Sequence, residues 1–308
     1  LNTRYRASAA EPIVLFSGVF DGAGRKQLIE CETIDGRLMP IRARDSLLAA
    51  MPGLRNRVPT YRAYARASIE EIVGPNPLAN ADRRSVTELR SGIFLSSPDS
   101  GRPFRFVPLP RPAQLAPIFG LAAGDFDGDG RADLYAVQNS HAPHPEIGRF
   151  SGGISQLLRG DGQGGLACVS PQESGLVVSG EARALAIKDF DRNGWPDFIV
   201  TRQNAAVLAF LNTPIEGRNG FSVRLVGEGA NDSAIGARIT IEHASGARQV
   251  AEIQVGGGYL SQSSTARFFG FLDDDPPREI RVQWPDGTSS AHSFPHGDTS
   301  IRLVKPVR

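Results

Sequence analysis

Two short stretches of the chain carry oxygen-bearing side chains at every second position. Residues 124–135 read GDFDGDGRADLY, and residues 188–198 read KDFDRNGWPDF. Carboxylates this close together repel one another, and a bound divalent cation relieves the repulsion. Carboxylate and carbonyl oxygens are the ligands that Ca²⁺ takes, at about 2.3–2.6 Å. The pattern therefore predicts two calcium sites, in a first Asp loop (residues 125–133) and a second Asp loop (residues 189–197).

The expected ligands follow from counting the first aspartate of each loop as position 1. Side-chain oxygens then fall at positions 1, 3, 5 and 9, a glycine at position 6 allows a sharp bend, and position 7 would supply its backbone carbonyl. The predicted ligands are Asp125, Asp127, Asp129, Asp133 and the Arg131 carbonyl in the first loop, and Asp189, Asp191, Asn193, Asp197 and the Trp195 carbonyl in the second. Water would fill the remaining coordination positions.

An EF-hand and a pair of polar hairpins are two other interpretations of these loops. An EF-hand needs a bidentate Glu at position 12, where the chain has Ala136 and Val200. It also needs helices on both sides, whereas strand-like apolar runs follow the loops at residues 134–137 and 198–200. We therefore expect each loop to join two β-strands. A pair of polar hairpins that bind no ion is the alternative that stays open.

A third copy of the pattern, reduced in its acids, lies near the start of the chain. Residues 18–29 read GVFDGAGRKQLI, and Asp21 is the one acid that they keep. We expect no metal in this reduced loop, because Val19, Ala23 and Gln27 replace the other acids. Three copies joined by Gly-rich hairpin signals, with a repeat of about 60 residues, are typical of the blades of a β-propeller.

The regions around these copies have different residue patterns. Residues 45–90 show helical spacing, with a capping box predicted at Ser68 and Glu71, a stop at residues 74–77 and a further helix at residues 79–89. This region is interpreted as a helical insertion between blades. Alternating strands without the Asp motif fill residues 216–308. The predicted class is all-β, with an incomplete propeller at residues 1–215 and a small β-domain at residues 216–308.

Bulk properties exclude several function classes. The net charge of +1 and the scattered arginines give no reason to expect nucleic acid as a partner. No apolar run reaches the roughly 18 residues of a membrane helix. The chain begins at Leu1, so we expect that a leading segment with any export signal has been removed. Cys31 and Cys168 could form a disulfide or stay as free thiols.

The motifs resemble known families. The D-x-D-G-D-G-x-x-D loops, each followed by an apolar strand, are similar to FG-GAP/VCBS repeats, the blades of integrin-α-like propellers. NDSAIGARI at 231–239, GGYLSQ at 257–262, FGF at 269–271 and VQWPDG at 282–287 resemble the ASPIC/UnbV domain. The combination resembles the cartilage-acidic-protein-like group of secreted bacterial proteins. The resemblance implies calcium-stabilised blades on an extracellular or cell-surface protein.

The expected function follows from both lines of argument. We expect a secreted or cell-surface calcium-binding structural or adhesion protein whose partners are other proteins, further copies of itself or glycans. A closed propeller of this family has about seven blades, so open strand edges or the C-terminal domain could join copies into oligomers or filaments. No catalytic residue and no organic cofactor are expected, since the chain lacks nucleophile-elbow and phosphate-loop motifs. The alternative is an extracellular glycan- or polymer-acting enzyme with structural calcium.

Overall fold

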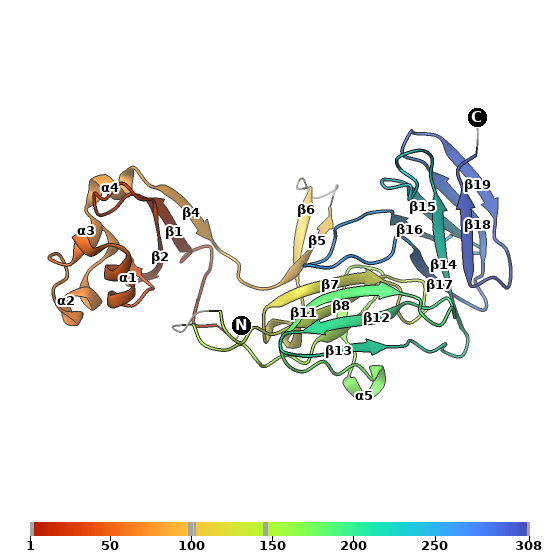
Figure 1. Ribbon diagram of the computed structural model, residues 1–308, viewed down its shortest axis with the longest axis horizontal. Helices are drawn as coiled ribbons and strands as arrows, with labels where there is room; N and C mark the ends of the chain where they lie inside the picture. Colours follow the sequence, from red (N-terminus) through yellow and green to blue (C-terminus); the bar gives the residue numbers. More distant parts are fainter. Residues whose placement is uncertain (1–2, 98–100, 102, 144–146, 307–308) are drawn as a thin grey trace. The chain divides into compact units, whose positions relative to one another are not determined.

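The computed structural model describes residues 3–97, 101, 103–143 and 147–306 (Figure 1). Strands hold 41% of the chain and helices 11%, which confirms the all-β class. The sheets are several and small, and in the described residues they do not close into a propeller. None of the described helices has the length and apolar character needed to cross a membrane. The chain divides into two compact units, residues 1–90 with 142–149, and residues 91–141 with 150–308.

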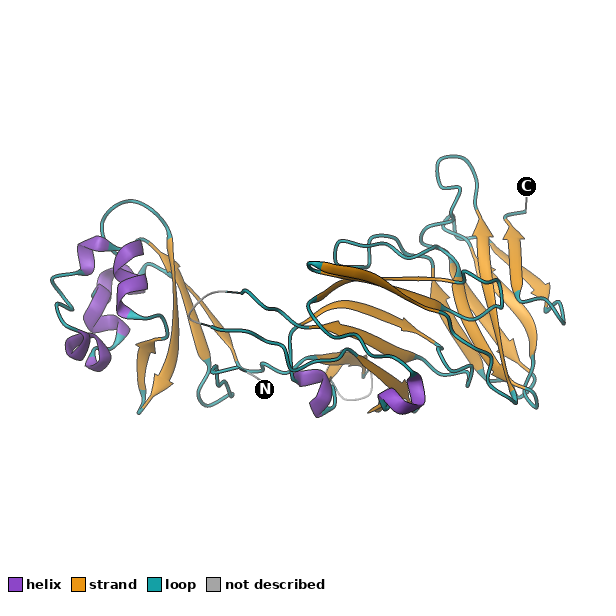
Figure 2. Ribbon diagram, turned by 60° about the horizontal axis from the view of Figure 1, so that its bottom comes forward, coloured by secondary structure: helices purple, strands orange, loops and turns teal. Residues whose placement is uncertain are grey.

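The first unit is a four-stranded antiparallel sheet covered by helices. Its strand order is β3-β2-β1-β4, and the helices described in this unit lie between β3 and β4 in the chain. The strands are β1 (Ile13–Gly18), β2 (Gln27–Ile34), β3 (Arg37–Pro40) and β4 (Asp82–Val86). The helices are α1 (Arg44–Ala50), the 3₁₀ turn η1 (Pro52–Leu54), α2 (Tyr61–Arg66), α3 (Ile69–Val73) and α4 (Pro75–Ala79). Figure 2 shows the helices gathered on one side of these strands.

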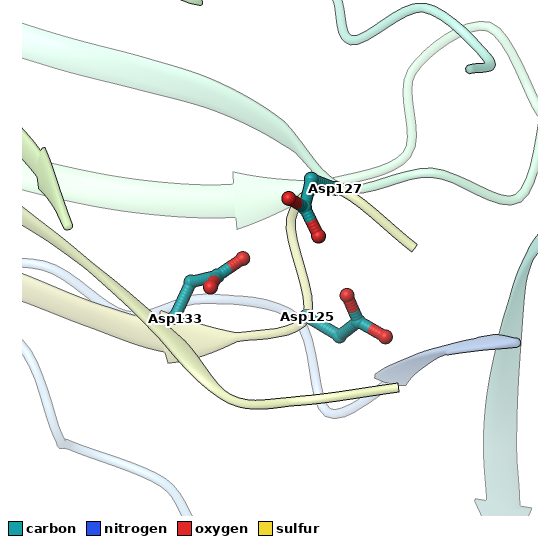
Figure 3. A group of neighbouring side chains, drawn as sticks. All are labelled: Asp125, Asp127 and Asp133. Carbon is teal, nitrogen blue, oxygen red and sulfur yellow. The ribbon is translucent and has the colours of Figure 1, made fainter. Parts of the chain in front are cut away.

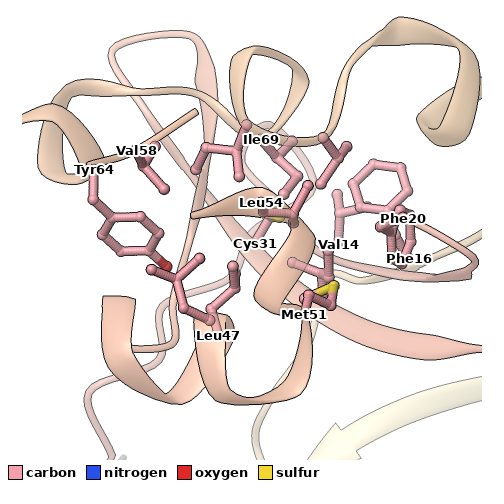
Figure 4. Packing of buried hydrophobic residues seen from close by; sticks show 14 residues of the cluster. Val14, Phe16, Phe20, Cys31, Leu47, Met51, Leu54, Val58, Tyr64 and Ile69 are labelled. Atoms are coloured by element: carbon pink, nitrogen blue, oxygen red, sulfur yellow. The ribbon is translucent and has the colours of Figure 1, made fainter. Parts of the chain in front are cut away.

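Sheet and helices of the first unit share one hydrophobic core. Val14 and Phe16 of β1 and Cys31 of β2 are buried against Leu47 of α1 and Ile72 of α3 (Figure 4). Burying such side chains stabilises the unit by about 25 cal/mol per Å² of apolar surface. The helical segment and the reduced loop between β1 and β2 thus belong to a single packed body. The helices cover the sheet that carries the reduced loop.

The helical predictions were partly correct. The capping box at α3 is confirmed, because Ser68 Oγ accepts from the Glu71 amide and the Glu71 carboxylate accepts from the Ser68 amide. Gly74, with φ +91°, ends that helix as expected. The predicted helix at residues 79–89 was wrong, because residues 82–86 form β4, which pairs with β1. Residues 45–90 therefore contain a strand as well as helices.

The reason for the misassigned strand is its position at the edge of the sheet. All five residues of β4 are exposed, so the segment has neither a helical nor an alternating apolar pattern. Its backbone instead pairs on one side with the strand β1. Pairing over a long sequence separation overrides weak local propensity here.

The second unit begins with three antiparallel sheets. They are the hairpin β5-β6, the meander β10-β9-β8-β7 and the meander β11-β12-β13. The strands are β5 (Gly92–Ser96), β6 (Phe104–Pro108), β7 (Ile118–Gly124), β8 (Asp133–Gln138), β9 (Gln156–Gly160), β10 (Leu166–Cys168), β11 (Ala182–Lys188), β12 (Asp197–Arg202) and β13 (Ala205–Phe210). Short helical turns lie at η3 (Arg111–Gln114) and α5 (Pro171–Ser174). The predicted strands after both Asp loops are therefore present.

The last part of the second unit packs two further sheets, β17-β14-β20 and β16-β15-β18-β19. Their strands are β14 (Arg218–Val226), β15 (Arg238–His243), β16 (Arg248–Glu252), β17 (Arg267–Leu272), β18 (Pro277–Gln283), β19 (Ser289–Ser293) and β20 (Ser300–Val304). Phe221, Ile239 and Trp284 belong to a core that both sheets share. The predicted boundary at residue 215 falls between β13 and β14, whereas the compact units divide at residues 90 and 91.

Both cysteines are free thiols. Cys31 is buried in the first unit, and burial, with a smaller contribution from Glu30, raises the pKa of its thiol to about 12. Cys168 lies in β10 and is half-buried. A thiol with so high a pKa is a poor nucleophile at neutral pH.

The shared core of the first unit leads to a stability prediction. Ile72→Ala removes a side chain with no exposed surface and should lower the free energy of unfolding by about 3 kcal/mol. Ile34→Ala at the end of β2, 47% exposed, is the matched control and should cost less than about 1 kcal/mol. Urea denaturation measures both. Equal costs would show that the helices do not complete the core.

Candidate metal centre

Each Asp loop joins two antiparallel strands at the same place in its sheet. The first loop connects β7 to β8, and the second connects β11 to β12. The position 9 aspartates, Asp133 and Asp197, are the first residues of β8 and β12. Position 6 has φ +84° at Gly130 and +88° at Gly194, a region that glycine enters without strain. The loops are therefore held at both ends by strands, as expected.

Three carboxylates converge in each loop. Ligand atoms of Asp125, Asp127 and Asp133 all lie within 4.8 Å of one another, and all three residues are buried (Figure 3). The matching residues of the second loop, Asp189, Asp191 and Asp197, meet the same limit. In that loop Asp197 is buried, Asp189 is half-buried and Asp191 is exposed.

The position 1 carboxylate organises the curl of each loop in the same way. Asp125 accepts hydrogen bonds from the amides of Gly130 at 2.8 Å and Asp129 at 3.1 Å. Asp189 accepts from the amides of Gly194 at 3.0 Å and Asn193 at 3.2 Å. Backbone amides that point at one carboxylate hold its oxygens in place and favour its charged form.

The position 9 carboxylate ties the loop to a third strand of its sheet. Each of these carboxylates accepts a hydrogen bond from the backbone amide that follows position 1. Each accepts another from a backbone amide at or just after the end of the third strand in its sheet. The donors are Phe126 at 3.0 Å and Gly160 at 2.9 Å to Asp133, and Phe190 and Asn212, both at 2.7 Å, to Asp197. Gly160 ends β9, and Asn212 follows β13. The two loops differ in sequence, yet each forms the same pattern of hydrogen bonds.

The position 5 side chains also close a turn within each loop, and their part in binding a cation stays a prediction. Asp129 does not join the converging carboxylates, and its Oδ1 accepts from the Arg131 amide at 2.9 Å. Asn193 Oδ1 likewise accepts from the Trp195 amide at 2.7 Å. These bonds close the turn between positions 5 and 7. The part of the carbonyls of Arg131 and Trp195 in binding a cation stays a prediction.

Without a cation, the buried negative charge of the Asp loops is electrostatically unfavourable. Burial raises the pKa of Asp125 to about 7, with the Gly130 amide opposing and the neighbouring aspartates adding to the rise. Burial also raises the pKa of Asp133 to about 6 against the amides of Gly160 and Phe126. The pKa of Asp197 is raised by the same cause. In each loop the three converging ligand atoms are carboxylate oxygens. Both loops therefore fit a hard divalent cation, which would offset their negative charge.

Two arginines that the motif did not reveal contact Asp127. Arg159 in β9 donates from Nε to Oδ2 at 2.7 Å, and Arg218 in β14 places Nη1 2.8 Å from Oδ1. Arg218 Nη1 also donates to the Asp127 carbonyl at 2.9 Å. The loop pattern contains no signal for either residue, since Arg218 lies 91 positions along the chain.

The strands of the C-terminal sheets approach both loops closely. A Cβ atom on Gly270 of β17 would lie 2.4 Å from Asp125 Oδ2 and 2.4 Å from Gly128 Cα. A Cβ atom on Gly220 of β14 would lie 3.0 Å from the ring of Trp195, which is itself buried. Small residues on β14 and β17 thus allow this close contact with the two Asp loops.

The reduced loop keeps the turn but not the acids. Asp21 Oδ1 accepts from the Ala23 amide at 3.0 Å, as Asp191 Oδ1 accepts from the Asn193 amide at 3.2 Å. The converging acid groups found among the described residues are those of the two Asp loops. The absence of metal from the reduced loop stays a prediction.

The raised pKa values predict how stability depends on pH in metal-free protein. A folded-state pKa above the unfolded value contributes stability at low pH that is lost as the pH rises through the folded pKa. Between pH 5 and pH 8, wild type should therefore lose about 2 kcal/mol relative to Asp125→Asn. Urea denaturation at both pH values, after removal of metal on a chelating resin, measures this difference. A difference independent of pH would contradict the raised pKa of Asp125.

Comparison with known proteins identifies the C-terminal part. Residues 227–308 match the family model described as ASPIC and UnbV. No curated protein matches the chain. The match begins directly after β14, so it covers β15 to β20, while β14 supplies the central strand of one of the two sheets. Residues 227–308 are therefore an ASPIC/UnbV domain.

Proposed function

We propose that this chain is a secreted or cell-surface calcium-binding protein with a structural or adhesive role. Two Ca²⁺ ions would bind between Asp125, Asp127 and Asp133 in the first loop, and between Asp189, Asp191 and Asp197 in the second. The observation that supports this best is the repetition of one hydrogen-bond network around three converging carboxylates in both loops. A polar hairpin that binds no ion has no need to bring three like charges together.

Calcium fits these loops better than other common cations. The converging donors are all carboxylate oxygens, which exclude the softer thiolate and imidazole sites typical of zinc. Magnesium requires a nearly ideal octahedron, whereas Ca²⁺ accepts irregular shells of six to eight oxygens. A curled loop with three converging carboxylates matches the second requirement.

The arrangement of the sheets supports propeller-type blades of the FG-GAP kind. Each Asp loop lies in the first hairpin of an antiparallel meander, β7 to β10 or β11 to β13. The two meanders share a core in which Tyr135 and Val137 of one pack with Leu185 and Phe198 of the other. Calcium at the loop ends would therefore stabilise two neighbouring blades together.

Self-assembly is the part of the proposal that concerns partners. The meander that begins at β11 has three strands where its neighbour has four, and its last strand, β13, pairs in the described residues with β12 alone. Val207 of β13 is 57% exposed. An open, apolar edge strand is a template for a strand from another chain. We propose a second copy of this protein as that partner, with other proteins or glycans as further ligands.

Removal of calcium tests the proposal. Chelation should lower the melting temperature, since about 100-fold excess of Ca²⁺ over Kd stabilises each site by about 2.7 kcal/mol. Asp125→Asn and Asp189→Asn should each remove part of this effect, and Asp21→Asn in the reduced loop, the matched control, should not. Differential scanning calorimetry gives the melting temperature, and sedimentation equilibrium gives the assembly size.

The two readouts separate the parts of the proposal. If chelation leaves the melting temperature of wild type unchanged, neither loop is a calcium site. If the melting temperature falls but the protein is a monomer with and without calcium, calcium is structural and self-assembly is wrong.

A further inference from the structure

The two Asp loops differ in the surroundings of their position 3 aspartates. In the first loop Asp127 is 7% exposed and lies between the guanidinium groups of Arg159 and Arg218. In the second loop Asp191 is exposed and accepts hydrogen bonds from the amide and side chain of Asn193. Among the residues that the structure describes, no Lys or Arg forms an ion pair with any of the three aspartates of the second loop.

The two oxygens of Asp127 are not equivalent. Oδ2 accepts a hydrogen bond from Arg159 Nε at 2.7 Å, and Arg159 is also paired with Glu173. Oδ1 is buried 2.8 Å from Arg218 Nη1 but lacks an aligned hydrogen bond, and Nη1 donates to the Asp127 carbonyl. Oδ1 is therefore attracted by charge but holds no directed bond. It is the oxygen most easily transferred to another cation.

Arg218 differs from Arg159 in where its backbone lies. Arg159 belongs to β9, in the same sheet as the first loop, so its position is set within one blade. Arg218 is the first residue of β14, which pairs with β17 and β20 in the C-terminal sheets. Its side chain is 28% exposed, so water screens the ion pair only in part.

A guanidinium 2.8 Å from Asp127 Oδ1 would repel a Ca²⁺ bound to the same oxygen. We propose that Arg218 is a built-in competing cation that weakens calcium binding at the first Asp loop. Calcium can then fill the first site only when Arg218 of β14 releases Asp127. This inference rests on the proposed function, since it assigns an order to the same two calcium sites. The second loop fills first, and the first loop fills at higher calcium concentration with loss of the Arg218–Asp127 ion pair.

The competition also links calcium to the C-terminal domain. Trp195 and the stem of Arg218 both pack against Gly128, where a Cβ atom would lie 2.5 Å from the Trp195 ring and 3.3 Å from Arg218 Cβ. Release of the guanidinium changes the contact between β14 and the first loop, whereas binding at the second loop leaves that ion pair intact. The first site is thus linked to the ASPIC/UnbV domain through the Arg218–Asp127 ion pair at the start of β14.

Calorimetric titration of one isolated site tests the proposal. The chain carries Asp189→Asn and Asp191→Asn, so that the first loop alone can bind, and CaCl₂ is the titrant. Arg218→Gln should raise the calcium affinity of this loop about fivefold, the gain expected from removing one partly exposed ion pair. Arg218→Lys, which keeps the charge, should stay near the parent value. Arg224→Gln, an exposed arginine of the same strand, is the matched control and should also leave the affinity unchanged.

The outcomes distinguish this inference from the function on which it rests. If Arg218→Gln is folded by circular dichroism and binds calcium equally or more weakly, Arg218 only braces the loop and the inference is wrong. The proposed function then stands, provided that wild type binds two Ca²⁺ per chain. If wild type binds none, the proposed function and the inference both fall. A measured order in which the first loop fills before the second would also overturn the inference.

Discussion

The mutual repulsion of three aspartates at the end of a β-hairpin is the constraint on which the second unit depends. Backbone amides of the loop hold Asp125 and Asp133 in place, and burial raises the pKa of both. The Gly160 amide draws a third strand of the sheet to the same point. Whatever neutralises these charges therefore also determines how the strand ends are held together. We propose that a divalent cation takes this role.

The C-terminal domain is built close to this charged end. Gly270 leaves no room for a side chain beside Asp125, and Gly220 leaves none beside Trp195. Arg218 brings a positive charge from β14 to Asp127. The contact between loops and domain is thus both steric and electrostatic. It provides a physical reason for one chain to carry Asp loops and an ASPIC/UnbV domain side by side.

Local patterns predicted the parts of the structure that short-range physics determines. The alternating aspartates, the glycine at position 6 and the following apolar runs correctly placed both loops between strands. The Ser68–Glu71 capping box was found for the same reason, because its two hydrogen bonds span three residues. The motifs of residues 231–287 indicated the C-terminal domain, which the family match confirms.

Long-range contacts account for what the sequence did not reveal. β4 becomes a strand because β1 offers it a partner, and none of its five residues is buried to mark that choice. The helices share a core with the sheet of the reduced loop, which no periodicity within residues 45–90 can indicate. Arg218 reaches Asp127 from a distant strand, 91 positions along the chain. In each case the contact forms between residues that only the folded chain brings together.

A crystal structure of the protein grown with calcium chloride tests the central claim most directly. We expect two anomalous peaks per chain, each about 2.3–2.6 Å from carboxylate oxygens at positions 1, 3 and 9 of an Asp loop. Water or the position 7 carbonyl would complete each shell. Loops that keep the same conformation with water in place of both peaks, at millimolar calcium, would contradict the account.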